Sequence, residues 1–199
     1  MTARIHPSAT VADSAVVGAR TQIWMHCQIR EGVRIGEDCI LGKNIYADPG
    51  VTIGDRVKIQ NNVSLFAGVT IEDGVFLGPH VCFTNDKVPR AINPDGTLKT
   101  ADDWQITPTR VETGAAIGAN TTIVCGVTIG AWAMIGSGSV VSRSVPPYAL
   151  VYGNPARRHG WVTPSGERAV FDGTDRFTDA TGFTLRRVRT PDGERVEPA

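Results

Sequence analysis

The sequence has no excess of either charge and no long apolar run. Its 199 residues include 20 Lys and Arg and 20 Asp and Glu, so the formal net charge is +0. Binders of nucleic acid or anionic membranes usually carry a basic excess. No run of about 18 apolar residues is present, and residues 1–10 lack a basic segment followed by an apolar one. We expect a cytoplasmic protein with neither nucleic-acid nor membrane partners.

Cysteine is also scarce, and its spacing argues against metal and redox motifs. The four cysteines are Cys27, Cys39, Cys82 and Cys125, and no two form a C-x-x-C pair. That spacing is unlike a zinc knuckle or a dithiol motif. We therefore expect reduced thiols that fill small apolar spaces, and we expect no bound metal.

What the sequence has in abundance is a repeat of six residues, each marked by an apolar residue. The first run comprises Ile5, Val11, Val17, Ile23, Ile29, Ile35, Leu41, Ala47, Ile53, Ile59, Leu65, Ile71, Leu77 and Phe83. The second run comprises Val111, Ile117, Ile123, Ile129, Ile135 and Val141. A second small or β-branched residue follows four positions later in most hexads, as Val33 and Val57 show. Each hexad therefore has two inward positions.

A period of six fits neither an α-helix nor an isolated alternating strand. A solenoid fits it, because each hexad can form one short strand and one turn. Repeats of the form [LIV]-G-x-x-[VAC]-x resemble those of the hexapeptide acyltransferases. The resemblance implies an all-β fold, a left-handed parallel β-helix with three hexads per coil. Residues 18 apart would then stack about 4.8 Å from each other, which places His26, Asn44, Asn62 and His80 in one column.

Two segments depart from the repeat. Residues 84–110 have no period, and we expect a long functional loop there, with a tolerated surface excursion as the alternative. Pro146 and Pro147 are predicted to end the strand register. We predict a β-helix domain over 1–159 and a small C-terminal β extension over 160–199.

The extension contains two similar turn sequences, TPSGERAV from Thr163 and TPDGERVE from Thr190. Proline followed by serine or aspartate and then glycine favours tight turns, so we expect β-hairpins rather than helix. Packing or an edge of the assembly is the expected role.

Three stretches narrow the resemblance: KIQNNVSLFAGVTIEDGVFLGP at 58–79, FTNDKVPRA at 83–91 and VYGNPARR at 151–158. Together they resemble the nucleotide-3-amino-sugar N-acetyltransferases, which acetylate UDP- or dTDP-linked 3-amino sugars. The resemblance covers roughly residues 4–162. It implies acetyl-CoA as co-substrate, a nucleotide-linked amino sugar as acceptor, and a homotrimer with three sites between neighbouring subunits.

The same resemblance assigns the site residues. Asn85 matches the asparagine of the family's F-T-N and is expected to hold the acceptor amine. Coenzyme A would lie along the C-terminal coils and the nucleotide sugar nearer the middle ones. Further candidates for the nucleotide sugar are Asn61, Asn62, Asp86 and Arg90. Candidates for coenzyme A are Ala115, Ala133, Gly136, Pro155, Arg157 and Arg158.

His80 is the candidate general base, because a neutral imidazole titrates near working pH and His80 lies five residues from Asn85. A substrate-orienting hydrogen bond and a passive corner histidine are the alternatives. The resemblance also allows the departing coenzyme A sulfur to take the proton.

Three other functions compete with N-acetylation. O-acetylation of a sugar hydroxyl needs a stronger base, usually a histidine held by a carboxylate. A γ-type carbonic anhydrase needs three zinc-binding histidines, and only His6, His26, His80 and His159 occur, without close spacing. A non-catalytic scaffold would not need the asparagine, the histidine or the long loop.

Overall fold

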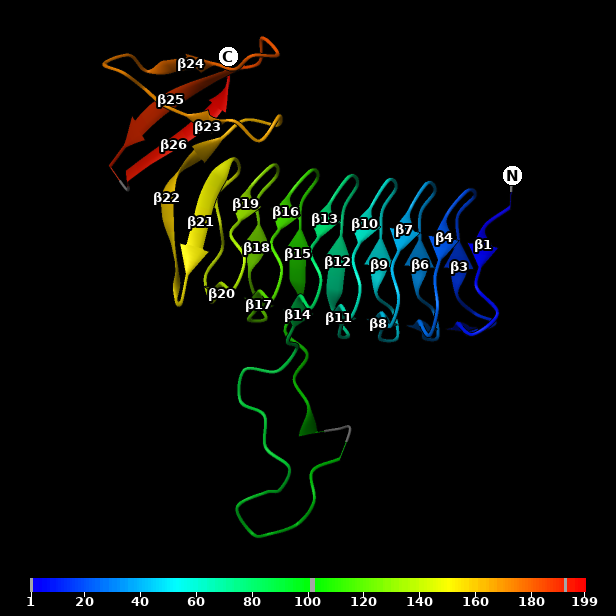
Figure 1. The fold of residues 1–199 in the computed structure, drawn as a ribbon. Helices are drawn as coiled ribbons and strands as arrows, with labels where there is room; N and C mark the ends of the chain where they lie inside the picture. The colour runs from blue at the N-terminus through cyan, green and yellow to red at the C-terminus, as the bar shows by residue number, and fades with distance from the viewer. Residues whose placement is uncertain (1, 101–102, 192) are drawn as a thin grey trace.

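The computed structural model describes residues 2–100, 103–191 and 193–199. The chain winds into a parallel β-helix whose coils stack in sequence order, with an arm leaving one edge and a small sheet at the C-terminal end (Figure 1). The predicted all-β solenoid with an inserted loop and a C-terminal β extension is confirmed. The described part of the chain has no helix that could span a bilayer.

Each regular coil contributes one strand to each of three sheets, here called faces A, B and C. In the solenoid, face A contains β1 (Arg4–Ile5), β4 (Gln22–Ile23), β7 (Ile40–Leu41), β10 (Lys58–Ile59), β13 (Phe76–Leu77), β16 (Ala116–Ile117), β19 (Met134–Ile135) and β21 (Ala149–Gly153). Face B contains β2 (Thr10–Val11), β5 (Gln28–Ile29), β8 (Tyr46–Ala47), β11 (Ser64–Leu65), β14 (Cys82–Phe83), β17 (Thr122–Ile123) and β20 (Val140–Val141). Face C contains β3 (Val16–Val17), β6 (Arg34–Ile35), β9 (Thr52–Ile53), β12 (Val69–Ile71), β15 (Thr109–Val111) and β18 (Thr128–Ile129).

The predicted inward residues form the core, and their register follows the 18-residue coil. Ile59 of β10 pairs with Leu77 of β13, and both side chains are fully buried. The predicted second inward position is also buried, as at Val33. The first coil differs, because Ile5 is 42% exposed at the open end of the solenoid.

The turns between the faces rely on left-handed backbone. His26, Asn44, Asn62 and His80 share the corner between faces A and B, and their φ angles are 59°, 56°, 62° and 62°. Asparagine tolerates this conformation better than most residues do. The predicted column is therefore a ladder of corner residues.

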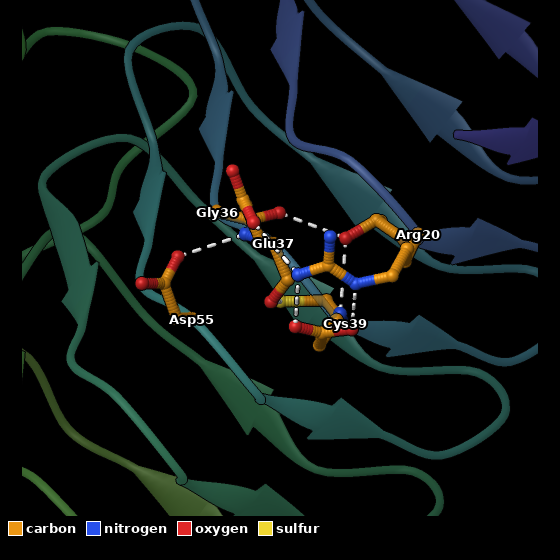
Figure 2. Close-up of polar contacts among 7 residues, drawn as sticks. Arg20, Gly36, Glu37, Cys39 and Asp55 are labelled. Atoms are coloured by element: carbon orange, nitrogen blue, oxygen red, sulfur yellow. Dashed lines mark hydrogen bonds and ion pairs between the residues drawn. The ribbon is translucent and has the colours of Figure 1, made fainter. Parts of the chain in front are cut away.

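Polar side chains from the next coil also cap the corners. Figure 2 shows the corner between faces C and A, where the Glu37 N–H donates to Asp55 Oδ1 at 2.8 Å. Arg20 bridges the carboxylates of Asp38 and Glu37, at 2.6 and 2.8 Å. The Asp55 contact satisfies a turn N–H group that the strands leave unpaired.

Three of the four cysteines fill small apolar spaces, as predicted, and the fourth does not. Cys27, Cys39 and Cys125 are buried, and all four thiols are free. Cys82 instead occupies the outward position of β14 and is only half-buried. It precedes the inward Phe83 and therefore points to the opposite side of the strand.

The 18-residue register ends just before Pro146 and Pro147, but the sheet continues beyond these prolines. β21 continues face A, with Leu150 paired to Met134 of β19. These partners are 16 residues apart rather than 18, so the last turn is shortened. The prolines lie in the turn that precedes β21, where no ladder hydrogen bond is required of them.

The C-terminal extension consists of short antiparallel strands. It contains β22 (Ala156–Val162), β23 (Arg168–Ala169), β24 (Arg176–Thr178), β25 (Thr184–Thr190) and β26 (Gly193–Pro198). β22 pairs with both β21 and β23, so it runs across residue 160. The extension packs on the last coil, where the Tyr148 and Phe183 rings lie 6.1 Å apart.

Candidate functional site

The aperiodic segment projects from the corner between faces B and C as an arm, here defined as residues 84–108 (Figure 1). Register partners across it, Ile71 and Val111, are 40 residues apart instead of 18. The parallel ladder nevertheless resumes directly at β15, so the arm is an insertion into one corner of an intact solenoid.

Two glycine corners anchor the base of the arm. A Cβ at Gly68, whose φ is 90°, would lie 2.7 Å from Ile106 Cγ2. A Cβ at Gly126 would lie 2.8 Å from Thr107 Cγ2. The Thr107 N–H also donates to the Asn85 carbonyl at 3.0 Å. The returning limb of the arm is thus fixed beside Asn85.

A recess of about 470 Å³ opens where the arm leaves the solenoid, here called the Arg90 recess. Its lining residues are Phe66, Thr84, Asn85, Asp86, Pro89, Arg90, Ala91 and Trp104. The structure therefore brings together three residues that the sequence assigned to the acceptor, Asn85, Asp86 and Arg90. The half-buried Asn85 amide has no hydrogen bond to any described side chain or backbone group, so a ligand can use it.

A second recess of about 500 Å³, here called the Lys99 recess, lies between the returning limb and the preceding coils. Its lining residues are Asp48, Pro49, Ala67, Asn85, Lys99, Thr100, Trp104 and Ile106. Asn85 and Trp104 line both recesses and form the ridge between them. The aperiodic sequence predicted a loop here but not the positions of Lys99 and Ile106, because no periodic pattern fixes where the loop turns back.

Among the charged residues of the two recesses, Asp48 has hydrogen-bond partners, whereas Arg90 and Lys99 have no ion-pair partner in the described chain. Asp48 is fully engaged, since Tyr46 donates to its Oδ1 at 2.7 Å and the Ala67 N–H to its Oδ2 at 3.0 Å. The bond to Asp48, helped by burial, raises the pKa of Tyr46. Arg90 and Lys99 form no ion pair with any residue in the described ranges. Both cations are therefore available to an anionic ligand.

His80 lies away from both recesses, at the corner between faces A and B. Its Nε2 is 3.2 Å from Asn62 Nδ2, and Asn62 Oδ1 accepts from Asn44 Nδ2 at 3.0 Å. Asn62 therefore donates to Nε2, which leaves the neutral ring's proton on Nδ1. Strand β14 separates His80 from Asn85, and at about 3.3 Å per residue the two side chains are beyond hydrogen-bonding reach.

Asn61 belongs to the same corner as His80. Its Oδ1 accepts from the Lys43 N–H at 2.9 Å, and it borders a recess of about 460 Å³ with Trp24 and Lys58. The predicted acceptor residues thus fall into two groups within one chain. Asn85, Asp86 and Arg90 gather at one corner, whereas Asn61, Asn62 and His80 gather at another.

The residues predicted to bind coenzyme A differ in their exposure. Ala115 and Ala133 have no exposed surface, which contradicts direct contact with a ligand, because they are the inward small residues of their hexads. A Cβ at Gly136 would lie 2.8 Å from Tyr152 Cβ, so its corner is covered by that side chain. Pro155 is exposed in the β21–β22 turn.

The two arginines that follow Pro155 also differ. Arg157 is exposed, and its only polar contact in the described chain is with the adjoining Ala156 carbonyl. Arg158 forms an ion pair with Glu194 at 3.2 Å and lies 4.3 Å from the centre of the Trp161 ring. Arg158 therefore joins β22 to β26, and Arg157 is the freer cation.

The histidines do not converge. His6 contacts Ser8 at 2.9 Å, and the His159 ring stacks on Tyr152 at 3.7 Å. Among the described residues, no three His, Cys, Asp or Glu side chains form a group suited to a metal ion.

Sequence comparisons support the repeat. A family described as bacterial transferase hexapeptide (six repeats) matches residues 14–44 and 108–143, and one described as hexapeptide repeat of succinyl-transferase matches 32–67. The chain is 54% identical over 63 residues to dTDP-3-amino-3,6-dideoxy-alpha-D-galactopyranose 3-N-acetyltransferase of Aneurinibacillus thermoaerophilus, covering 32% of this chain and 33% of the relative. It is 33% identical over 150 residues to the bifunctional protein GlmU of Heliobacterium modesticaldum, covering 74% of this chain and 32% of the relative. The matches span about a third of these relatives' lengths.

Solved structures support the fold. The acetyltransferase domain of PglB from Neisseria gonorrhoeae, in complex with acetyl coenzyme A, superposes with a TM-score of 0.52 at 19% identity, over 78% of this chain and 57% of that chain. A variant of GDP-perosamine N-acetyltransferase from Caulobacter crescentus, in complex with CoA and GDP-perosamine, superposes with a TM-score of 0.50 at 24% identity, over 80% and 57%. At these identities the likeness concerns the fold. Residues 14–67 and 108–143 carry the hexapeptide repeat of these transferase families.

Proposed function

We propose that this protein is an acetyl-CoA-dependent N-acetyltransferase that acts on an amino group, at C3, of a UDP- or dTDP-linked amino sugar. The observation that carries the proposal is the Arg90 recess, in which the free Asn85 amide lies beside Asp86 and Arg90. The 54% identity to a nucleotide 3-amino-sugar N-acetyltransferase supports it.

The recess suits the reacting groups. The Asn85 side-chain oxygen can accept a hydrogen bond from the sugar amine and hold its lone pair toward the thioester carbonyl. The amine nitrogen bonds to the acetyl carbon, the carbon–sulfur bond breaks, and coenzyme A leaves as a thiolate. The amine's proton passes to that thiolate, or to His80 if Nε2 releases the hydrogen bond from Asn62. Arg90, free of any described acidic partner, would bind the diphosphate.

The co-substrate would lie on the C-terminal coils, toward the β21–β22 turn. Pro155 and Arg157 keep their proposed role there, with Arg157 as the phosphate-binding cation, whereas Tyr152 covers the Gly136 corner. Arg158 is less suited, because Glu194 already neutralises it. A cytoplasmic location remains part of the proposal.

An amine is favoured over a hydroxyl as the acceptor. A hydroxyl acceptor needs a strong base, and His80 would supply one best if a carboxylate oriented its ring. The hydrogen-bond partner of His80 is instead the Asn62 amide. Because Asn62 occupies Nε2 and no carboxylate orients the ring, His80 is not arranged as a strong base, and an acceptor amine that is already nucleophilic is favoured.

The proposed assembly is a homotrimer with sites between subunits. Outward side chains on face A include the apolar Ile40 and Phe76, which are 37% and 38% exposed. Large apolar side chains on a flat sheet face suit a subunit interface. The separation of His80 from Asn85 within one chain adds support, because one site can use both only if two chains contribute.

The deciding experiment measures coenzyme A release from acetyl-CoA with a panel of UDP- and dTDP-linked amino sugars and their hydroxyl analogues. We expect turnover with at least one 3-amino sugar and none with its hydroxyl analogue. Turnover with the hydroxyl sugar instead would establish O-acetylation. Absence of turnover with every amino sugar would contradict the proposal.

A further inference from the structure

The Lys99 recess and the Arg90 recess share Asn85 and Trp104 and differ in their other side chains. The Lys99 recess is bordered by one aromatic and two aliphatic surfaces, Trp104, Ile106 and Pro49, with the Lys99 ammonium and the Thr100 hydroxyl beside them. The Arg90 recess also has apolar walls, including Phe66 and Pro89, and it adds the Asp86 carboxylate and the Arg90 guanidinium. The carboxylate of the Lys99 recess is Asp48, whose two oxygens already accept hydrogen bonds from Tyr46 and Ala67. The Lys99 recess can therefore receive a flat ring with an attached anion, and the Arg90 recess keeps a carboxylate and an amide for a polar sugar.

Trp104 is the residue that most needs an explanation. It is 56% exposed, although tryptophan is among the side chains that gain most from burial. It forms no hydrogen bond or ring contact within the described ranges, although its position lines both recesses. An exposed indole beside an unpaired lysine is the usual composition of a surface on which a nucleic base stacks.

Contacts with the solenoid fix two walls of the Lys99 recess. Ile106 packs against the Gly68 corner, which fixes the returning limb on the solenoid. Asp48, on the opposite side, is locked by its two hydrogen bonds from Tyr46 and Ala67. A ring could therefore bind between the returning limb and Asp48 with little rearrangement, because both of these walls are already fixed.

We propose that the Lys99 recess is the nucleotide subsite, in which the base of a nucleoside diphosphate stacks on Trp104 and Lys99 pairs with the phosphates. This inference rests on the proposed function and assigns the two parts of the acceptor to different recesses. The amino sugar occupies the Arg90 recess, and the diphosphate crosses the ridge at Asn85 with Arg90 on one side and Lys99 on the other. Trp104 is then a positioning residue that sets the acceptor's register.

The test is calorimetric titration of the full-length protein with UDP and dTDP at low and high salt. Trp104→Ala should weaken binding roughly 5- to 150-fold, the range for loss of one base–aromatic stack. Trp104→Phe should stay within about threefold, because a phenyl ring still stacks. Lys99→Gln should weaken binding mainly at low salt and flatten its salt dependence, whereas Trp104→Ala should leave that dependence unchanged.

Matched controls and kinetics sharpen the result. Trp132→Phe removes another exposed tryptophan, and Lys87→Gln removes another lysine of the arm, and both should bind like wild type. With the nucleotide sugar, Trp104→Ala should raise KM more than it lowers kcat.

Three outcomes would overturn the inference. Wild-type affinity in Trp104→Ala would refute the subsite and leave the proposed function standing. Shielding of Trp104 from a soluble quencher in the nucleotide-free protein would mean that a second chain covers it. Failure of the wild type to bind either nucleoside diphosphate would remove the proposed substrate class and the subsite together.

Discussion

Asn85 is the residue whose placement most restricts the chemistry. Its backbone carbonyl is tied to Thr107 while its side-chain amide is free and faces both recesses. We expect Asn85→Ala to lower kcat about 100-fold or more, because the amine loses the group that orients it. The KM for acetyl-CoA should change little. Asn93→Ala, which removes only an arm contact to Thr97, is the control. Steady-state kinetics in which KM for acetyl-CoA rises as steeply as kcat falls would place Asn85 elsewhere.

His80 gives a different expectation, because asparagine already occupies its corner one and two coils earlier with nearly the same φ. His80→Asn should therefore keep the thermal stability of the wild type, and circular dichroism should show the same unfolding midpoint. If His80 removes the amine's proton, kcat should fall about 100-fold. Nearly full turnover in the variant would leave the proton to the departing thiolate.

At the scale of elements, Gly68 links the solenoid to the arm. A side chain there meets Ile106 and requires a left-handed φ of 90°, whereas Gly74 has a φ of 66° and open space around it. Gly74→Ala should cost about 1–2 kcal/mol of stability, the left-handed penalty alone. Gly68→Ala should cost more and should also weaken nucleoside diphosphate binding. Chemical denaturation and titration of the two variants separate strain from displacement of the limb. Equal stability and equal binding in both would show that Ile106 does not position the recess.

The C-terminal extension depends on the carboxylate of Asp179. It accepts hydrogen bonds from Thr181, which is the largest cause, and from Ser165, and these hold its pKa well below the ordinary value. A depressed carboxyl pKa stabilises the folded state above the unfolded value of about 3.9, and that stability is lost as pH falls through the folded pKa.

Asp179→Asn should therefore lower the stability of the extension at pH 7 and reduce its further loss in acid. Emission from Trp161, which lies in β22 of the extension and donates to Glu194, reports the transition. Asp172→Asn, at an exposed position, is the control and should follow the wild type. An Asp179→Asn curve that falls in parallel with the wild type below pH of about 4 would show that other carboxyls dominate.

Sequence periodicity predicted the strands because each inward position must be apolar, and that requirement repeats at every coil. It could not predict the arm, where no register fixes which residues meet, so Lys99 and Ile106 were missed. Proximity in sequence was misleading at His80, since five residues along a strand lead to the next corner. It was misleading at Ala115 as well, because a small residue reads equally as a core filler or as a ligand contact.

For the whole molecule, the apolar exterior of face A leads to a prediction about assembly. Phe76→Asp would place a charge in the proposed interface, where burial without a partner is costly. We expect light scattering to show monomers with an unchanged β-sheet spectrum and little activity. Gln28→Asp, at an exposed outward position of face B, is the control and should remain trimeric. A wild type that is active as a monomer would contradict the assembly itself.

The separation of His80 and Asn85 allows a sharper test, which needs no knowledge of the interface. If one site takes His80 from one chain and Asn85 from its neighbour, a trimer mixed from His80→Asn and Asn85→Ala chains contains some sites with both wild-type residues. In a cyclic assembly, equal random mixing restores about a quarter of the sites. Co-refolded variants should then regain activity that neither variant shows alone, whereas unmixed variants combined in the assay should not. If each site lies within one chain, no mixture restores both residues, and activity stays at the level of the separate variants.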